Sequence, residues 1–393
     1  MKKILPLIIL VFFATSIFAQ FHQGKIKQKH YLQVIPYQEI KGWIVVPVTI
    51  NGKSYNFILD TGAPLVLSDK LFNELNLQVI SQINPSDIAG ERKEMRLILL
   101  PEIDLQGITF LNTQGAVFNE DFYWAEWSEC LGIDGLIGSN MLRHSVVQFD
   151  EQNKQIIIAD HIKKLSLQTN EYQKIKLAIK GNNPFVPVIL QKGMQTSVRN
   201  VLFDTGDANA FFTLSLGESG SGVDIITENE GFFGIGAHRI FRKQKHALLN
   251  IPELVVNKMR FNDVIATTTH ARESRIGVKL LQYGKITLDY KKKRFYFEPF
   301  NNINTNKPVE TPWSINITFQ NDKFVVGIIW DKTLESQINI GDEVLSINGI
   351  DIQFMSFCEW CMLEIPENDK RIYELKDINT GEIKTIEIER VHP

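Results

Sequence analysis

The most constraining feature of this 393-residue chain is an internal repeat in which the tripeptide Asp-Thr-Gly occurs twice. The first copy, Asp60-Thr61-Gly62, follows the apolar run Phe57-Ile58-Leu59, and the second, Asp204-Thr205-Gly206, follows Val201-Leu202-Phe203. Short apolar runs that end at a turn are typical of β-strands. The chain is therefore expected to place one aspartate at the end of a strand in each of two similar halves.

Further segments recur in the same order in both halves. Val46-Pro47-Val48 precedes the first tripeptide and Val186-Pro187-Val188 the second, and later residues 138–158 parallel residues 277–297. Most of these segments are short apolar runs bounded by Gly, Asn or Asp, and Asn51-Gly52 between two such runs predicts a hairpin turn. The repeat predicts a mostly β fold with two pseudo-symmetric lobes that bring the two aspartates together at their interface.

The two predicted lobes, residues 30–165 and 166–300, differ locally. Residues 68–75 begin with a Ser and have the composition of a short capped helix. In the second lobe this helix is expected to be replaced by a flexible Gly- and Ser-rich stretch over residues 216–222. The first lobe also carries an aromatic and acidic insertion at residues 119–127, which either lines the substrate site or packs over a lobe.

The amino-terminal residues have the pattern of an export signal. Lys2 and Lys3 are followed by the almost wholly apolar run 4–18 and by the small residue Ala19. This pattern predicts a secretory signal peptide over residues 1–19 that is cleaved after Ala19. The apolar run is shorter than the roughly 20 residues that a membrane-spanning helix needs. We therefore expect an exported protein, periplasmic or extracellular, without a membrane span after signal removal.

Charge and cysteine content limit the classes of partner. The formal net charge is −3 and no acidic or basic block is present, so the sequence favours no nucleic-acid partner. The three cysteines are Cys130, Cys358 and Cys361. An odd, small number in an exported protein argues against a disulfide framework, so Cys358 and Cys361 are expected to be half-buried helical thiols. Their spacing also matches a redox or metal motif, which is the alternative.

Two aspartates held close together have a definite chemistry. Neighbouring carboxylates do not both ionise easily, so the pair shares one proton, and one member acts as base and the other as acid. The glycines of the two tripeptides lack a Cβ and let the loops approach, and the threonines are expected to hydrogen-bond to the opposite loop. These supporting residues are Thr61, Gly62, Thr205 and Gly206. The pattern predicts that Asp60 and Asp204 activate a water molecule for attack on a peptide carbonyl.

At these residues the chain resembles the aspartic peptidases. Asp60-Thr61-Gly62-Ala63 matches the retropepsin form of their motif, Leu136-Ile137-Gly138 matches the apolar-apolar-Gly motif that follows it, and Ser274-Arg275-Ile276-Gly277 is a worn second copy. The two lobes in one chain are similar to pepsin, but they are short, as in retropepsins. The resemblance covers roughly residues 31–300. It implies acid-protease β-barrel lobes in a monomeric endopeptidase that hydrolyses peptide bonds without a metal or another cofactor.

The resemblance also implies a β-hairpin flap over the substrate in each lobe. Gly90 falls at the expected tip of the first flap, and Gly234 and Gly236 fall at the second; a solvated loop without substrate contact is the alternative. Residue 207 is Asp, where the family usually has Ser, Thr or Ala. An ionised Asp207 would disfavour a further charge on the pair unless it points to solvent. An inactive peptide-binding or sensing protein with the same fold is therefore the alternative function.

The C-terminal residues are expected to form a separate module. Residues 301–312 are rich in Asn, Thr and Pro and predict a linker. Residues 313–393 resemble a PDZ domain in the Gly-Asp turn, apolar strand and Asn-Gly turn of residues 340–349. Residues 324–330 are the expected earlier strand and residues 356–364 the expected groove helix. The resemblance implies a small α+β domain that binds a peptide as an added strand, with a docking role or no ligand as alternatives.

Overall fold

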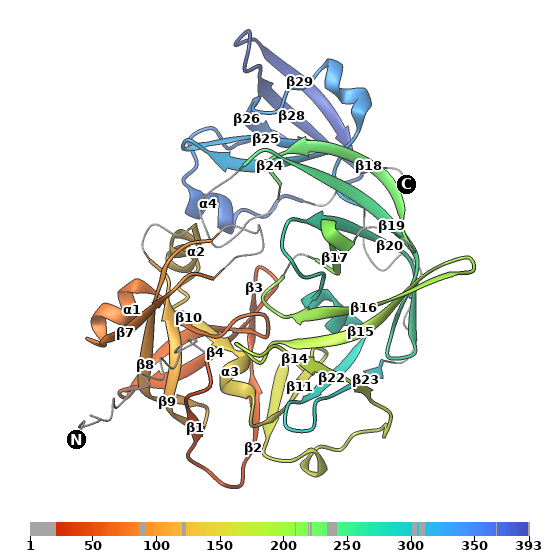
Figure 1. Cartoon of the computed structure of the whole chain (residues 1–393). Coiled ribbons are helices and arrows are strands. Elements are labelled where there is room, and N and C mark those ends of the chain that lie inside the picture. Colours follow the sequence, from red (N-terminus) through yellow and green to blue (C-terminus); the bar gives the residue numbers. More distant parts are fainter. Residues whose placement is uncertain are drawn as a thin grey trace, which may run out of the picture.

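The computed structural model describes residues 21–85, 92–119, 123–208, 210–218, 220, 222–233, 242–300, 305, 311–366 and 368–391. The signal peptide predicted over residues 1–19 lies outside these ranges, as do the predicted flap glycines Gly90, Gly234 and Gly236 and most of the predicted linker. Within the described ranges the fold is mostly β, as predicted, with strands arranged in four sheets (Figure 1).

Nine strands of residues 21–165, called the first half below, form one sheet. Its order is β1 (Lys25–Ile26), β9 (Ile108–Val117), β6 (Leu65–Leu67), β10 (Gly135–Gly138), β5 (Lys53–Asp60), β4 (Trp43–Ile50), β8 (Met95–Leu105) and β7 (Val79–Ile83), with β3 (Gln38–Ile40) paired to β4. Asn51 and Gly52 form the predicted turn between β4 and β5, both with positive φ. The predicted capped helix is α1 (Asp69–Glu74), where Ser68 Oγ accepts the N–H of Leu71. Two further helices are α2 (Tyr123–Leu131) and α3 (Ser139–Leu142).

The second half, residues 166–300, contains a corresponding sheet of eight strands. Its order is β14 (Lys176–Leu177), β15 (Pro184–Lys192), β16 (Gln195–Asp204), β21 (Arg275–Gly277), β17 (Phe212–Ser215), β20 (Met259–Thr269), β19 (Gln244–Val256) and β18 (Asp224–Gly231). No α-helix like α1 follows β17 in the described residues of this half; a 3₁₀ turn, η2 (Leu216–Glu218), begins the stretch that was expected to be flexible throughout. A second 3₁₀ helix, η3 (Val278–Tyr283), stands where the first half has α3.

A third sheet joins the two halves. Its order is β13 (Gln173–Lys174), β23 (Arg294–Pro299), β22 (Gly284–Asp289), β11 (Val146–Asp150), β12 (Gln155–Ala159) and β2 (Leu32–Pro36). In the chain, β12 is followed by a 3₁₀ turn, η1 (Ile162–Lys164). The central pairing is antiparallel between β11 of the first half and β22 of the second. One hydrophobic core runs through both halves, and Phe149 and Phe203 meet edge to face within it, with ring centroids 5.9 Å apart. The shared sheet and core fix one half against the other, and so fix the strands that carry the aspartates.

The C-terminal sheet, strands of residues 313–391, has its own core. Its order is β24 (Ile315–Gln320), β25 (Lys323–Ile329), β26 (Glu343–Ile347), β28 (Lys370–Lys376) and β29 (Ile383–Glu389), with β27 (Ile350–Asp351) paired to β26. The two helical elements are η4 (Lys332–Ser336) and α4 (Phe357–Met362), the latter starting in a Ser356–Glu359 capping box. The expected strand at 324–330 is β25, and β24, which precedes it, lies at one edge of this sheet.

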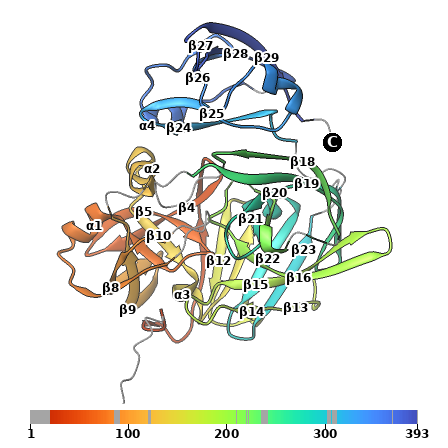
Figure 2. The same ribbon diagram turned by 45° about the horizontal axis from the view of Figure 1, so that its top comes forward.

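The C-terminal sheet packs on β18 and β19 of the second half (Figures 1 and 2). The N–H of Phe232 donates to the carbonyl of Gly327 at 2.8 Å, and Asn229 Nδ2 donates to the carbonyl of Ile329 at 2.7 Å. Trp330 is fully buried and shares an apolar cluster with Leu248 of β19. This sheet is therefore packed on the second half by both backbone and apolar contacts.

A disulfide ties the same sheet to the first half. Cys130 of α2 is bonded to Cys358 of α4 across 228 residues of sequence, while Cys361 is buried and has a free thiol. The expectation that Cys358 is a free helical thiol was wrong. The insertion that contains α2 packs on α4, where Trp127 meets Phe357 edge to face with ring centroids 5.1 Å apart. Helix packing between distant segments, which cysteine spacing does not reveal, brings the two sulfur atoms together.

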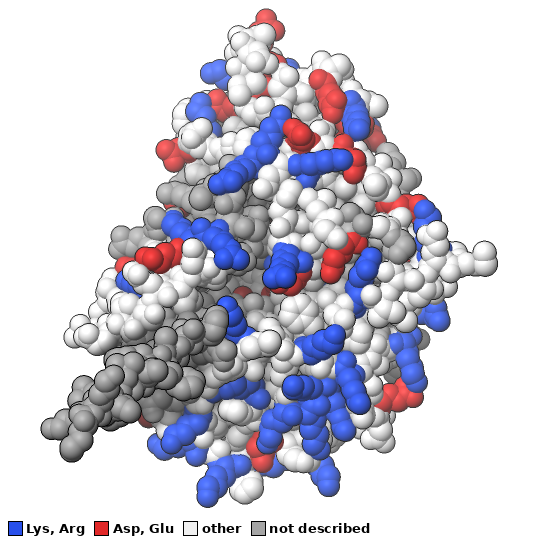
Figure 3. All heavy atoms as spheres, viewed as in Figure 1, with Lys and Arg blue, Asp and Glu red and all other residues white. Residues whose placement is uncertain are grey.

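The surface charge is unevenly distributed despite the small net charge. Figure 3 shows that Lys and Arg are more numerous over the part of this face where β11, β14 and β22 lie in Figure 1. Of the helices in the described residues, none has the length and apolar character that crossing a membrane requires.

Candidate active site

Each aspartate of the repeat stands at the end of a strand that is central in its sheet. Asp60 ends β5, and its register partner in the parallel strand β10 is Gly138. Asp204 ends β16, and its partner in the parallel strand β21 is Gly277. A Cβ at either glycine would overlap the backbone of the loop that follows the aspartate in the same half. Leu136-Ile137-Gly138 thus lies beside Asp60 and the worn copy, Arg275-Ile276-Gly277, lies beside Asp204; the glycine of each leaves room for the turn that follows.

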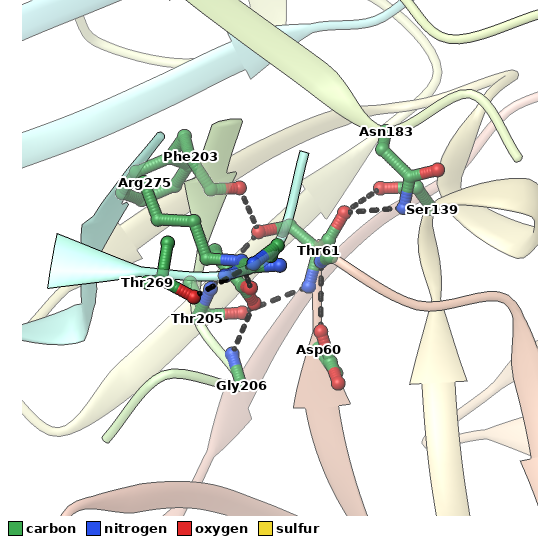
Figure 4. Close-up of polar contacts among 12 residues, drawn as sticks. Asp60, Thr61, Ser139, Asn183, Phe203, Thr205, Gly206, Thr269 and Arg275 are labelled. Atoms are coloured by element: carbon green, nitrogen blue, oxygen red, sulfur yellow. Dashed lines mark hydrogen bonds and ion pairs between the residues drawn. The ribbon is translucent and has the colours of Figure 1, made fainter. Parts of the chain in front are cut away.

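The two threonines cross between the halves and bond each other's loops (Figure 4). The N–H of Thr61 donates to Oγ1 of Thr205 at 3.0 Å, and the N–H of Thr205 donates to Oγ1 of Thr61 at 3.0 Å. Each hydroxyl then donates to a carbonyl of the opposite strand, Thr61 to Phe203 at 2.5 Å and Thr205 to Leu59 at 2.7 Å. Both threonines are fully buried. The expected bonding across the loops is present, and all four interactions are reciprocal.

The glycines allow the two carboxyl groups to meet. The N–H of Gly62 donates to Oδ1 of Asp60 at 2.7 Å, and the N–H of Gly206 donates to Oδ1 of Asp204 at 3.1 Å. A Cβ on Gly62 would overlap the carboxyl group of Asp204, and a Cβ on Gly206 would overlap that of Asp60. Each aspartate therefore occupies the space that a side chain on the opposite glycine would take.

Asp204 perturbs the ionisation of Asp60. Asp60 is half-buried and shares a side-chain hydrogen bond with Asp204. Burial raises the pKa of Asp60 well above its ordinary value, and the negative charge of Asp204 raises it further. The N–H of Gly62 opposes this rise by donating to the carboxylate. The pair therefore favours a state in which one proton is held between two carboxyl groups.

Asp207 is not fully solvated. It is half-buried, and burial raises its pKa to about 6, with the charge of Asp204 as the second cause. Its carboxylate also accepts the N–H of Ala210, as a residue that caps a turn does. Asp207 therefore caps the following turn and is also within electrostatic reach of Asp204.

Several residues at the site escaped the sequence reasoning. Ser139 Oγ donates to the carbonyl of Thr61 at 2.8 Å and lies 2.9 Å from the hydroxyl of Tyr290. Asn183 Nδ2 donates to the same Thr61 carbonyl at 3.1 Å, and Trp43 Nε1 donates to the carbonyl of Gly206 at 2.7 Å. Ser139 directly follows the Leu-Ile-Gly motif, so its place near the site could have been predicted from the sequence. The other residues come from segments with no motif and are brought to the site only by the fold.

Part of the first half is similar to known proteins of one family. The pattern that defines the aspartyl protease family matches residues 46–141, which hold Asp60 and the Leu-Ile-Gly motif. Among solved structures, the chain is similar to a retropepsin-like aspartic protease from Rickettsia conorii, with 16% sequence identity and a TM-score of 0.25 over 34% of this chain and 95% of that one. No curated protein matches the chain. The family match supports an aspartyl protease function for this protein.

Proposed function

We propose that the protein is an exported aspartic endopeptidase in which Asp60 and Asp204 activate a water molecule for peptide-bond hydrolysis. The observation that supports this most strongly is the reciprocal bonding of Thr61 and Thr205, because it holds both carboxyl groups in one place from two separate loops. Buried polar atoms that are fully paired in this way form a rigid support. Proton transfer requires the acid and the base to be held within hydrogen-bond reach of the reacting atoms, and this support meets that requirement.

The proposed reaction uses the two carboxyl groups in opposite roles. The carboxylate takes a proton from water as the water oxygen bonds to the scissile carbonyl carbon, and the protonated partner donates its proton to the carbonyl oxygen. The resulting diol collapses when the carboxyl group that took the proton of water gives it to the amide nitrogen, the C–N bond breaks, and a diol hydroxyl returns its proton to the other carboxylate. The pair then holds one proton again, so the cycle consumes one water molecule and needs no metal or other cofactor.

The partners and the location follow from the same proposal. The substrate is a peptide or an unfolded protein segment, and the active species is a monomer because one chain supplies both aspartates. The C-terminal sheet is proposed to be a PDZ-like docking module for a peptide or protein, with β24 as its open edge. Cleavage of the signal peptide after Ala19 would place the protein in the periplasm or outside the cell.

Replacing either aspartate by Asn tests the proposal directly. Asp60→Asn and Asp204→Asn should each lower kcat/KM on the order of 10⁴-fold, and the double variant should be no worse because the pair acts as a unit. The measurement is cleavage of a denatured protein mixture from acid to neutral pH, with and without a transition-state peptide inhibitor. Asp224→Asn, at an ion pair with Lys192 on the surface, is the matched control and should cleave normally. Substantial hydrolysis by either single variant would refute the assignment.

A catalytically inactive peptide-binding or sensing protein is the second candidate. The observation that favours it is the presence of two further charged groups, Arg275 and Asp207, next to Asp204. In an inactive binder these groups would fix Asp204 in one charge state that is unsuited to catalysis. The same assay separates the candidates: a binder retains the transition-state peptide but cleaves no component of the mixture.

A further inference from the structure

The two halves differ on the neighbouring strand, at the position two residues before the glycine that pairs with each aspartate. In the first half Leu136 of β10 pairs in register with Ile58, two residues before Asp60. In the second half the equivalent position in β21 is Arg275, which pairs with Leu202. Leu136 is 5% exposed and belongs to an apolar cluster, as expected for a core residue. Arg275 is 6% exposed, so an arginine is buried where the repeat calls for an apolar side chain.

A buried guanidinium is costly unless a negative charge compensates it. The compensating group is Asp204: Nε of Arg275 lies 3.3 Å from Oδ2 of Asp204, within ion-pair distance although not aligned as a hydrogen bond. Both oxygens of Asp204 therefore have a positive or N–H partner, since Oδ1 accepts the N–H of Gly206. In Figure 4 Arg275 lies on the side of Thr205 and Gly206, away from the carboxyl group of Asp60.

Asp60 has no equivalent cation among the described residues that touch it. Its neighbours among these residues are the N–H groups of its own loop, the carboxyl group of Asp204 and, at longer range, the hydroxyl of Tyr290. Both aspartates thus accept the same kind of N–H bond from their own loops, but only Asp204 has a cationic side chain beside it. A single proton shared by such a pair goes to the member without the cation.

We propose that Arg275 is a positioning residue that keeps Asp204 in its carboxylate form, so that Asp60 carries the proton shared by the pair. The catalytic consequence rests on the proposed function: Asp60 is the acid that donates to the carbonyl oxygen, and Asp204 is the base that receives the proton of water. Arg275 acts only through Asp204 and needs no contact with substrate.

The other charged groups near Asp204 do not reverse this assignment. Asp207 is an opposing carboxyl group on the same loop, and the charges of Arg275 and of Lys279 in η3 both act on it. With its pKa at about 6, Asp207 is mostly neutral at the acidic pH where the pair takes up its second proton. Over that range, Arg275 is the dominant charge facing Asp204 apart from Asp60 itself.

The test removes the charge and follows the pair by two independent measurements. Arg275→Leu copies the first half, Arg275→Lys retains the charge, and Arg199→Leu removes a half-buried arginine elsewhere in the second half. The first measurement is the pH dependence of kcat/KM on a cleaved peptide. Loss of the cation makes the carboxylate harder to form, so the acid limb should move up by about one to three pH units in Arg275→Leu. It should move less in Arg275→Lys and stay in place in Arg199→Leu.

The second measurement needs no activity. Carboxyl-carbon NMR of the full-length protein labelled at aspartate, assigned with Asp60→Asn and Asp204→Asn, reports the ionisation of the pair in the free state. We expect the carbon of Asp60 to show the protonated form wherever the pair holds one proton, and the lower apparent pKa of the pair to rise in Arg275→Leu. If Arg275→Leu does not fold, Arg275→Gln removes the charge and keeps a polar side chain of similar reach.

The outcomes separate the two proposals. A shifted NMR titration in a protein that cleaves no peptide supports the role of Arg275 and refutes the proposed protease. Identical titration curves in wild type and a folded charge-free variant overturn the role of Arg275, whatever the activity. A shift of the same size in Arg199→Leu would also overturn it, because the effect would then come from overall charge or stability.

Discussion

The two halves present the same backbone to the paired aspartates but different side chains beside it. The N–H of Ala63 points to the carbonyl of Asp60 at 3.4 Å, and the N–H of Asp207 points to the carbonyl of Asp204 at 3.2 Å, so both loops make the same turn. The side chains at these positions differ: a methyl group in the first half and a carboxyl group in the second. The same contrast appears one strand away, where Leu136 in one half corresponds to Arg275 in the other.

This difference has a physical reason. Each loop needs the threonine of the opposite loop to satisfy its buried N–H group, so neither backbone can change without leaving a polar atom of its partner unpaired. The flanking side chains carry no such mutual requirement. Charge can therefore be added to one half alone. The reciprocal backbone bonds preserve the geometry of the pair, while the flanking side chains give its two carboxyl groups different surroundings.

The halves also hold the C-terminal sheet in different ways. The first half is joined to it by the covalent bond between Cys130 and Cys358, and the second half by apolar packing around Trp330 and Leu248. The first connection is made by α4, and the second by Trp330, directly after β25. Variants that remove one connection at a time separate their contributions to stability.

The largest effect is expected from the connection to the second half. Trp330→Ala removes a fully buried ring between the C-terminal sheet and the second half, and should lower the free energy of unfolding by about 3–5 kcal/mol. Loss of the disulfide in the double variant Cys130→Ser/Cys358→Ser should cost about 2–4 kcal/mol. Urea unfolding measures both. A thiol reductant should reproduce the second cost in wild type and leave the double variant unchanged; an unaffected wild type would mean that the bond adds no stability.

The next effect tests the symmetry of the loops. Gly62→Ala and Gly206→Ala each place a Cβ on the carboxyl group of the opposite aspartate and should lower kcat/KM at least about 100-fold. The two losses should be similar, because each variant displaces one member of the same pair. Gly220→Ala is the control, since a Cβ there meets open space. If one catalytic-loop variant stays active while the other is not, the approach of the two loops is not reciprocal.

The smallest effect concerns the carboxyl group that only the second half carries. The folded protein raises the pKa of Asp207 from 3.8 to about 6, so it binds this proton more tightly than the unfolded chain does. That contribution to stability is fully present below pH 3.8 and is lost as the pH rises through about 6. Asp207→Asn should therefore gain stability relative to wild type between acid and neutral pH, by on the order of 1 kcal/mol.

Urea unfolding of Asp207→Asn and wild type at pH values below 3.8 and above 6 measures this gain. Ala63→Asp installs the same carboxyl group in the first half and should lose stability over the same interval. A pH-independent difference between Asp207→Asn and wild type would show that the folded protein does not hold the proton of Asp207 more tightly.

Much of the site was predictable because its signals are local. Asp60, Gly62 and their counterparts lie in one tripeptide after an apolar strand, and the chemistry of paired carboxyl groups requires glycine and threonine there. The turn at Asn51-Gly52 and the cap at Ser68 were equally readable, since turn and cap preferences depend on a few adjacent residues. Tyr290 and Asn183 were not predictable, because nothing beside them in the chain indicates the carbonyl or hydroxyl they meet.

The strands, the repeat and the paired aspartates could be identified from the amino-acid sequence alone, because each is encoded within short stretches of adjacent residues. The bond between Cys130 and Cys358 and the ion pair between Arg275 and Asp204 could be seen only in the folded chain. These outcomes depend on how segments from distant parts of the chain pack together. Burial then fixes their charge and bonding, since a buried cation or polar atom must find its partner wherever the fold provides one.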